Sequence, residues 1–287
     1  MNLKEKIFRN IKDLSYDIGF YIKDLYGNEI KYNENKTFES ASCIKVFILI
    51  EYFRQVFNNE KSIFDYFEYK KEDNIPGLNS GIIGSFDYGL KLTSKDYVTL
   101  MIIYSDNIAT NKIIEYLGID NINKTIKKLG FKDTYLFNEL NLMKYFKFGQ
   151  TTPYEYAKVY DMLLNNKVIN EEVSKNCLEI LKKQKYNDML IKYLPAMDLL
   201  FKGTKDSNID YIASKSGSIV WIKDEMKNAR NDGGIISTKY GDYILSIFIS
   251  NLDDIRFNSD NKGVEIGSQI SKIIYEEFID NKGVLKW

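Results

Sequence analysis

The chain has 287 residues, of which 44% are hydrophobic and 28% charged, a composition typical of a soluble globular protein. Forty basic and forty acidic residues balance, and no block of Lys and Arg stands out, so nucleic acid is not an expected partner. The chain contains no histidine, which excludes a Ser-His-Asp triad and a histidine-ligated metal site. We therefore expect neither a metal nor a cofactor.

The first predicted element is an amino-terminal helix. Residues 1–14 carry apolar side chains at positions 3, 7, 11 and 14 with charges between them, the spacing of an amphipathic helix. The segment lacks the apolar stretch and cleavage site of a secretory signal, which predicts a cytoplasmic protein, or a secreted one if a leader was removed. No apolar run reaches the ~20 residues that a membrane-spanning helix needs.

The remaining elements follow from changes in hydrophobic period. Strands are predicted at 18–23 and through about residue 32, with a turn at 25–28 between them. Helical periodicity begins at Ser42 and returns after Ser94, which we expect to cap its helix. The later predicted elements are helices at 108–117, 122–129, 153–164 and 170–183, strands at 212–221, 234–238 and 243–251, and a last helix at about 264–278.

Two early and three late strands enclose a helical middle. This order predicts an α+β fold in which both termini build one five-stranded antiparallel sheet, with helices on its faces and a separate helical lobe. We expect a single unit (1–287) with an α/β subdomain of about 1–41 and 205–287 and a helical subdomain of about 42–204. The two cysteines, Cys43 and Cys177, are too few for a disulfide framework or a zinc site and are expected to be free.

Three short motifs stand in a fixed order along the chain. They are Ser-Cys-Ile-Lys at 42–45, Ser-Asp-Asn at 105–107 and Lys-Ser-Gly at 215–217. A serine hydroxyl is a poor nucleophile until a base takes its proton, and desolvation or a neighbouring cation can lower the pKa of a lysine enough for that task. Together the motifs supply a nucleophile, a lysine one helical turn away, a second hydroxyl and a second ammonium. This set predicts acyl transfer without histidine.

A second copy of the first two motifs occurs near the carboxyl terminus. Ser-x-x-Lys recurs at 259–262, and Ser-Asp-Asn recurs at 259–261. This copy lies in a polar run, 258–263, that is typical of a loop before the last helix. We interpret it as a chance match, because short patterns often recur without function.

The ordered triple resembles that of class A serine β-lactamases and penicillin-binding proteins. The flanking sequences extend this resemblance from about Gly19 to the last helix, nearly the whole chain. They are Phe-Glu-Ser-Ala before the first lysine motif at 38–41, Leu-Lys-Leu-Thr-Ser-Lys-Asp at 90–96, the run 101–111 around the second motif, Thr-Thr-Pro at 151–153, and Ala-Arg-Asn-Asp at 229–232.

The resemblance implies roles for the motif residues in acylation. Ser42 would attack the acyl carbonyl with Lys45 as its activating base, and Ser105 would relay a proton to the leaving nitrogen. Asn107 would contact both Lys45 and the amide chain of the substrate. The backbone amides of Ser42 and Ser218 would form an oxyanion hole.

The same resemblance implies how a substrate and a water are held. Lys215 and Ser216 would bind a substrate carboxylate, with Arg230 as a further cationic contact. Asn141 would help to hold the hydrolytic water.

One departure from the family concerns hydrolysis of the acyl-enzyme. Class A enzymes carry a glutamate four residues before the loop asparagine, and here that position is Phe137. Glu139 matches a second, structural carboxylate of the loop, although a shifted loop could bring it to the water, so we retain it as a candidate base. The arginine–aspartate pair that ties the loop ends is also missing, with Tyr135 and Gln150 nearby. Acylation is expected to be intact, and turnover is the open question.

The sequence therefore predicts a serine hydrolase that opens β-lactams through an acyl-enzyme. Two alternatives stay open: a peptidase or esterase of the same fold acting on D-amino-acid peptides or small esters, and a penicillin-binding acyl trap or sensor. The expected partner is a small β-lactam or peptide-like substrate, and we expect a monomer.

Overall fold

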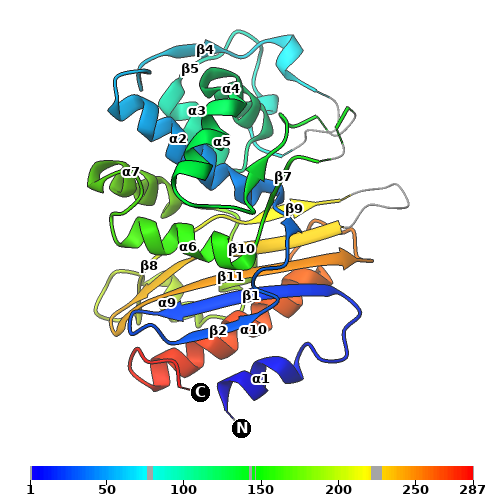
Figure 1. The fold of residues 1–287 in the computed structure, drawn as a ribbon, viewed down its shortest axis with the longest axis vertical. Coiled ribbons are helices and arrows are strands. Elements are labelled where there is room, and N and C mark those ends of the chain that lie inside the picture. Colours follow the sequence, from blue (N-terminus) through cyan, green and yellow to red (C-terminus); the bar gives the residue numbers. More distant parts are fainter. Residues whose placement is uncertain (1, 76–79, 142–143, 146, 221–227, 287) are drawn as a thin grey trace.

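The computed structural model describes residues 2–75, 80–141, 144–145, 147–220 and 228–286. Its main sheet is antiparallel and is built from strands of both terminal regions, as predicted (Figure 1). The strand order is β2-β1-β11-β10-β8, and a short strand, β9, continues the β8 edge by pairing with β10. These strands are β1 (Asp17–Asp24), β2 (Glu29–Tyr32), β8 (Ile209–Ser214), β9 (Gly217–Ile219), β10 (Asn228–Thr238) and β11 (Gly241–Leu252).

Each face of the sheet has its own hydrophobic core, because successive side chains of a strand point to opposite faces. Phe20 and Ile247 face the helices at the two ends of the chain, α1 (Leu3–Arg9) and α10 (Lys262–Asp280). Tyr21 and Phe248 face the other side, where α6 (Pro153–Leu164) packs across β1 and β11. The sheet is thus covered on both faces.

The helical part of the molecule is assembled around α2 (Lys45–Phe57), ten of whose residues are buried. Helices from both sides of it in the sequence pack against α2 and against one another. These are α3 (Ser94–Ile103), α4 (Asn107–Leu117), α5 (Ile119–Lys128) and α7 (Glu171–Leu181). In Figure 1 this part lies on the far side of α6 from α1 and α10. The division into subdomains at residues 41 and 205 stays a prediction.

Several smaller elements were not predicted. Two short helices, α8 (Asp188–Ile191) and α9 (Ala196–Leu200), follow α7. One small sheet has the order β3-β7-β6, and another pairs β4 with β5. Their strands are β3 (Phe38–Glu39), β4 (Tyr66–Glu68), β5 (Lys91–Thr93), β6 (Tyr135–Leu136) and β7 (Gly149–Thr151), and the 3₁₀ turns are η1 (Ala41–Ile44), η2 (Lys71–Asp73) and η3 (Ile83–Ser85).

Three local predictions need correction. The first helix ends at Arg9 rather than at residue 14. Thr93 caps α3, with its side chain accepting from the Asp96 amide, so Ser94 is the first helical residue. The predicted strand 212–221 is two strands, β8 and β9, and its last residue, Trp221, lies outside the described residues. Both cysteines are free and buried, as predicted.

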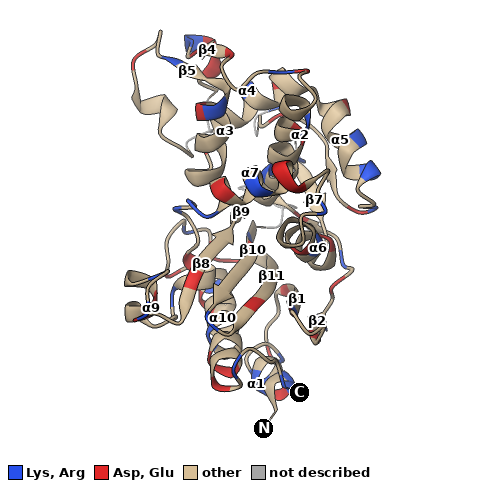
Figure 2. Cartoon of the chain, turned by 90° about the vertical axis from the view of Figure 1, so that its left-hand side faces the viewer, with Lys and Arg blue, Asp and Glu red and all other residues tan. Residues whose placement is uncertain are grey.

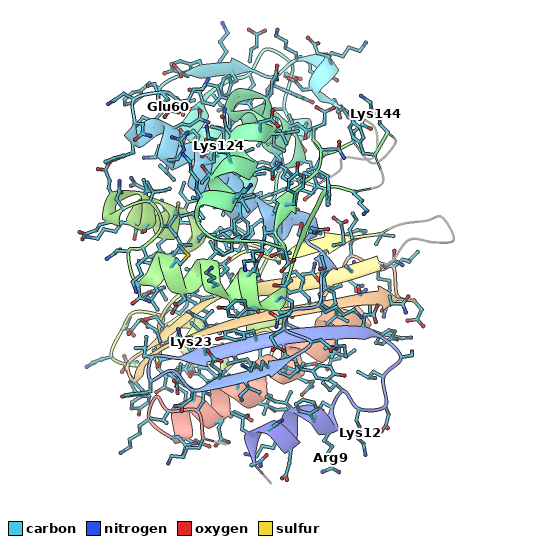
Figure 3. The ribbon with its side chains drawn as sticks, in the orientation of Figure 1. Arg9, Lys12, Lys23, Glu60, Lys124 and Lys144 are labelled. Atoms are coloured by element: carbon cyan, nitrogen blue, oxygen red, sulfur yellow. The ribbon has the colours of Figure 1, made fainter. Side chains whose placement is uncertain are left out.

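The surface mixes both signs of charge along the whole length of the molecule (Figure 2). Arg9, Lys12, Lys124 and Lys144 are exposed and project outward (Figure 3). Over the described ranges, no helix combines the length and apolar character required to cross a membrane. The same ranges contain no cluster of three or more Cys, Asp or Glu side chains suited to a metal ion.

Candidate active site

Ser42 lies in the tight turn η1, directly before α2. A 3₁₀ turn has three residues per turn, so the side chain of Lys45 stands on the same face as that of Ser42. Ser42 is partly exposed, whereas Lys45 is completely buried. Ala41 has φ +46°, in the left-handed region that non-glycine residues rarely adopt. Such strain persists only where surrounding contacts hold it, which is typical of functional sites.

The turn that carries Ser42 is held between two strands by two glycines. A Cβ on Gly217 of β9 would lie 2.9 Å from the Ser42 nitrogen, and a Cβ on Gly149 of β7 would lie 2.7 Å from Ser40 Oγ. Asn231 of β10 adds a side-chain hydrogen bond from Nδ2 to the Glu39 carbonyl at 2.9 Å. Only glycine permits both close approaches. The contact at Gly217 brings the third motif beside the proposed nucleophile.

The side chains of all three motifs converge on Ser105. Lys45 Nζ donates to Ser105 Oγ at 3.2 Å, to the Ser105 carbonyl at 2.8 Å and to Asn107 Oδ1 at 3.0 Å. Lys215 Nζ donates to the same Ser105 Oγ at 3.1 Å and to the Ser216 carbonyl at 2.7 Å. We call Lys45, Ser105, Asn107 and Lys215 the lysine cluster. The structure thus brings together the first, second and third motifs.

The second motif is fixed by its own middle residue. The buried Asp106 carboxylate caps α4 by accepting from the Ala109 amide at 2.8 Å, and it also accepts from the amides of Ile82 and Ile83. Ser105 has φ +50°, so this anchored loop holds it in a strained conformation with its hydroxyl between the two lysines. Gly81 has φ +110° and faces Asp106 too closely for a Cβ.

Burial lowers the pKa of both lysines, and the charge of Lys215 adds to this effect at Lys45. Desolvation lowers the pKa of Lys45 well below its usual value, and the charge of Lys215 lowers it further, while Asp106 acts in the opposite direction. Burial also lowers the pKa of Lys215 to about 8, opposed by Cys43 and Asp232. A lysine that loses its proton near neutral pH can act as a general base.

Two residues without a role in the sequence analysis support Lys215. Burial raises the pKa of Asp232 to about 8, and its carboxyl is the acidic group whose charge acts on Lys215. Tyr156 of α6 donates its hydroxyl proton to the Lys215 carbonyl. The only sequence signal for Asp232 was its place in the run 229–232 that carries the resemblance, whereas nothing local singled out Tyr156.

The structure does not bring Arg230 to the lysine cluster. Asn231 reaches the nucleophile turn, so its neighbour Arg230 points to the opposite face, where it packs on Gly263 of α10. Its guanidinium donates to the carbonyls of Ala229 at 2.8 Å and Arg256 at 2.7 Å, and it stacks on the Phe257 ring. The predicted contact with a substrate carboxylate therefore has no support from this geometry.

Ser216 and Ser218 lie on the strand edge beside the cluster. The Ser216 hydroxyl donates to the carbonyl of Tyr186, and Ser218 is exposed in β9 opposite Arg230. Ser218 follows Gly217, the residue pressed against the Ser42 amide. The predicted oxyanion hole from the Ser42 and Ser218 amides stays a prediction that this proximity favours.

Glu139 is likewise not brought to the cluster. It is exposed and lines a surface hollow of about 540 Å³ together with Glu115 and Gly118 at the carboxyl end of α4. Asn107 is at the amino end of the same helix, roughly 12 Å away along its axis at 1.5 Å per residue. The Asn141 side chain accepts from the Lys144 amide at 3.2 Å, a turn within its own loop. Catalytic roles for Glu139 and Asn141 stay untested predictions.

Phe137 stands four residues before Asn141, where the resemblance to class A enzymes predicts a glutamate. Its half-buried ring packs against Tyr135, with the Lys147 ammonium 5.3 Å from the ring centroid. A phenyl ring cannot take a proton from water. The sequence position that the resemblance assigns to a general base therefore carries an apolar group.

The loop ends are tied together by means other than an arginine–aspartate pair. Strands β6 and β7 pair through Tyr135 and Gln150, and the Phe137 amide donates to the Phe148 carbonyl at 2.8 Å. The buried carboxylate of Glu155 accepts from the Lys132 amide and from Thr134 Oγ1, both at 2.6 Å. A backbone ladder and one buried carboxylate thus replace the missing ion pair.

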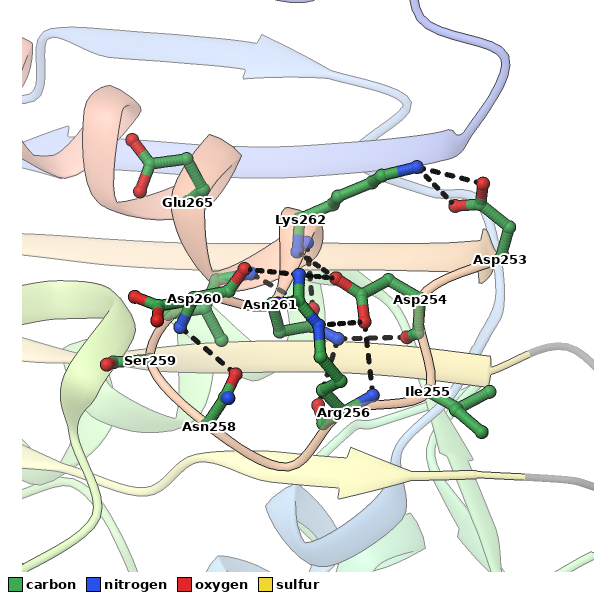
Figure 4. A network of polar contacts seen from close by, with 12 residues as sticks. Asp253, Asp254, Ile255, Arg256, Asn258, Ser259, Asp260, Asn261, Lys262 and Glu265 are labelled. Atoms are coloured by element: carbon green, nitrogen blue, oxygen red, sulfur yellow. Dashed lines mark hydrogen bonds and ion pairs between the residues drawn. The ribbon is translucent and has the colours of Figure 1, made fainter.

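The second Ser-Asp-Asn copy has a structural role at the start of α10. Asn261 caps the helix by accepting from the amide of Gly263. Figure 4 shows the network of polar contacts around Asn261. Ser259 is exposed, and the Lys262 ammonium is paired with Asp253 at 2.9 Å. These residues form a loop and a helix cap, in agreement with the prediction of a loop here.

The fold is that of the β-lactamase type of serine hydrolase, and the lysine cluster lies within it. A sequence model of the Beta-lactamase enzyme family matches residues 2–278, and the chain belongs to this family.

Solved structures support the fold along nearly the whole chain. A β-lactamase from Sphaerobacter thermophilus is 25% identical, with a TM-score of 0.81 and coverage of 98% of this chain and 97% of that one. PBP-A is 22% identical, with a TM-score of 0.79 and coverage of 97% and 96%. A class A β-lactamase representative from Bacteroides cellulosilyticus is 21% identical, with a TM-score of 0.80 and coverage of 98% and 99%.

Proposed function

We propose that this protein is a class A-like serine hydrolase that opens β-lactam rings through an acyl-enzyme on Ser42, with slow release of the product. The observation that carries the proposal is the lysine cluster, in which two buried lysines share the hydroxyl of Ser105. Lys45 follows Ser42 by one tight turn, and burial lowers its pKa. These are the conditions under which a lysine can activate a serine.

In this proposal, acylation uses these contacts. Ser42 Oγ attacks the lactam carbonyl, its proton passes to Lys45, and the amides of Ser42 and Ser218 stabilise the negative oxygen. As the ring C–N bond breaks, Ser105 gives its hydroxyl proton to the leaving nitrogen and regains one from a lysine of the cluster. The hydrogen bonds from Lys45 and Lys215 to Ser105 Oγ provide this route.

Substrate binding uses the charged edge of the same cluster. Lys215, with its pKa lowered to about 8, still carries a proton on most molecules at pH 7 and attracts a carboxylate. Ser216, whose hydroxyl donates to the Tyr186 carbonyl, would turn to the substrate carboxylate, and Asn107 would bind an amide of the substrate. Arg230 has no part in this version of the site.

Slow product release is proposed because Phe137 replaces the family's glutamate. This feature also favours the two alternatives, a penicillin-binding acyl trap or sensor and a peptidase or esterase of the same fold. A mutant of PBP-A was solved as an acyl-enzyme complex with penicillin G, and its structure has a TM-score of 0.78 to this chain. A fast lactamase and an acyl trap differ in turnover, not in acylation.

Intact-protein mass spectrometry after mixing with penicillin G tests the proposal. The expected result is a covalent adduct with the full mass of the penicillin, absent from Ser42→Ala and retained in the matched control Ser259→Ala. No adduct and no hydrolysis at any pH from 6 to 9 would overturn the proposed function. An adduct that survives Ser42→Ala would assign a different nucleophile.

A further inference from the structure

Glu39 stands three residues before Ser42, and no role has been assigned to it. It pairs with Gln150 in the β3–β7 ladder. The ring of its neighbour Phe38 packs on Phe248 of the main sheet, so the Glu39 side chain points to the other side of β3. There, Glu39 Oε1 accepts a hydrogen bond from the Gly149 amide at 3.3 Å.

Gly149 binds the nucleophile segment from two directions. Its amide donates to the Glu39 carboxylate, and its carbonyl accepts from the Ser40 amide at 2.9 Å. A Cβ at this glycine would meet Ser40 Oγ at 2.7 Å and Ile44 Cγ1 at 3.0 Å. Gly149 therefore contacts residues on both sides of Ser42 closely. Of its two hydrogen bonds to this segment, only the one to Glu39 involves an ionisable group.

The surroundings of the carboxyl group set its charge near neutral pH. Burial raises the pKa of Glu39 to about 7, opposed by the amides of Gly149, Ala41 and Phe148. Lys147, from the loop before β7, is the charged group whose field acts on it. From β10 the uncharged Asn231 side chain reaches the Glu39 carbonyl. The group thus changes charge in the pH range where the site would work.

We propose that Glu39 is a positioning residue, whose carboxylate fastens the strained turn at Ala41 and Ser42 to Gly149 of β7. Its contacts are backbone amides rather than the reacting atoms, so it acts through the placement of Ser42. The expected effect of Glu39 on the acylation rate rests on the proposed function, since it requires Ser42 to be the nucleophile. The binding of the carboxylate to the Gly149 and Ala41 amides is independent of the proposed function.

Ionisation of Glu39 strengthens this attachment. Hydrogen bonds to a charged acceptor are shorter and about twice as strong as those to a neutral one. The left-handed Ala41 needs such an external constraint, because nothing in its own conformation favours φ +46°. Acylation should therefore be faster with Glu39 ionised than with Glu39 protonated.

Amide NMR tests the attachment without any substrate. The amide protons of Gly149 and Ala41 should shift with pH, with a common midpoint near the pKa of about 7. Glu39→Gln should abolish this titration, and Glu34→Gln, a nearby half-buried glutamate outside these contacts, should leave it intact. Amide shifts that do not titrate, or that still titrate in Glu39→Gln, would overturn the inference.

Acylation kinetics test the consequence for Ser42. Glu39→Gln should acylate about fivefold more slowly than wild type at pH 8 and equally fast at pH 5.5, where wild-type Glu39 is protonated. If Glu39→Gln acylates at the wild-type rate at pH 8, the positioning role is wrong. This holds also if the variant then releases the adduct more slowly than wild type. If wild type takes no acyl group at all, the proposed function fails, while the amide titration still decides the inference.

Discussion

Lys45 and Lys215 donate hydrogen bonds to the same oxygen, Ser105 Oγ, at 3.2 Å and 3.1 Å. Both lysines are completely buried. Two ammonium groups at this separation repel each other strongly in a poorly solvated site, so the cluster favours a state with one of them neutral. Burial lowers the pKa of each lysine, and the charge of Lys215 lowers that of Lys45 further.

The first prediction concerns the pH dependence of acylation. Lys215→Met removes the cation that lowers the pKa of Lys45, so that pKa should rise and the midpoint of the acylation rate should move to higher pH, by about one unit or more. The rate of acylation by penicillin, measured by intact mass spectrometry from pH 5.5 to 9.5, gives the midpoint of the pH profile separately from the maximal rate. Lys185→Met, an exposed lysine beside the site, is the control, and an unmoved midpoint in Lys215→Met would show that the two lysines are not coupled.

The second prediction concerns stability. Lys215 has a folded pKa of about 8 and an unfolded value of 10.5, so between these pH values the unfolded chain binds more protons than the folded one. The contribution of Lys215 to the free energy of unfolding should therefore rise with pH, by roughly 3 kcal/mol over the whole window. Denaturant unfolding of wild type and Lys215→Met at pH 7.5 and 9.5 measures it. A difference between the two proteins that is constant with pH would contradict the lowered pKa.

Arg230 is predicted to stabilise the fold rather than to bind substrate. Its guanidinium donates to backbone carbonyls, including those of Ala229 and Arg256, which Arg230→Met would leave unpaired. We expect a loss of ~2–4 kcal/mol in the free energy of unfolding and a less than threefold change in acylation at 15 °C, where the variant remains folded. Arg9→Met, an exposed arginine of α1, should be neutral in both assays. Acylation reduced tenfold or more, with stability unchanged, would restore the carboxylate-binding role.

The contrast between Arg230 and Lys45 shows which parts of the site could be predicted from sequence. Lys45 follows Ser42 by a fixed local spacing, and the main sheet follows from strand patterns at both ends of the chain. The face of the sheet on which the Arg230 side chain lies could not be predicted in this way. All eleven residues of β10 are buried because both faces of the sheet are covered, so hydrophobic alternation carries no signal there.

Long-range pairing explains the other misses. Glu155 ties the loop through amides more than twenty residues away, and Glu39 contacts Gly149 across 110 positions of sequence. Such contacts depend on which segments meet in the folded chain, and local periodicity does not encode them. The short helices α8 and α9 have four and five residues, too few for a helical period to be recognised.

The last prediction concerns turnover, because Phe137 departs from the class A pattern that the sequence resembles. General base catalysis typically contributes ~10²–10⁴-fold, so a site without a carboxylate at this position should release its acyl group slowly. Intact mass followed over time should show the penicillin adduct persisting for minutes or longer. Because Glu139 lies near the far end of α4, Glu139→Gln should release the adduct at the wild-type rate. Rapid clearance by wild type that Glu139→Gln slows would instead show that the loop moves and brings Glu139 to the water. Rapid clearance that Glu139→Gln leaves unchanged would point to Lys45 as the base of the second step.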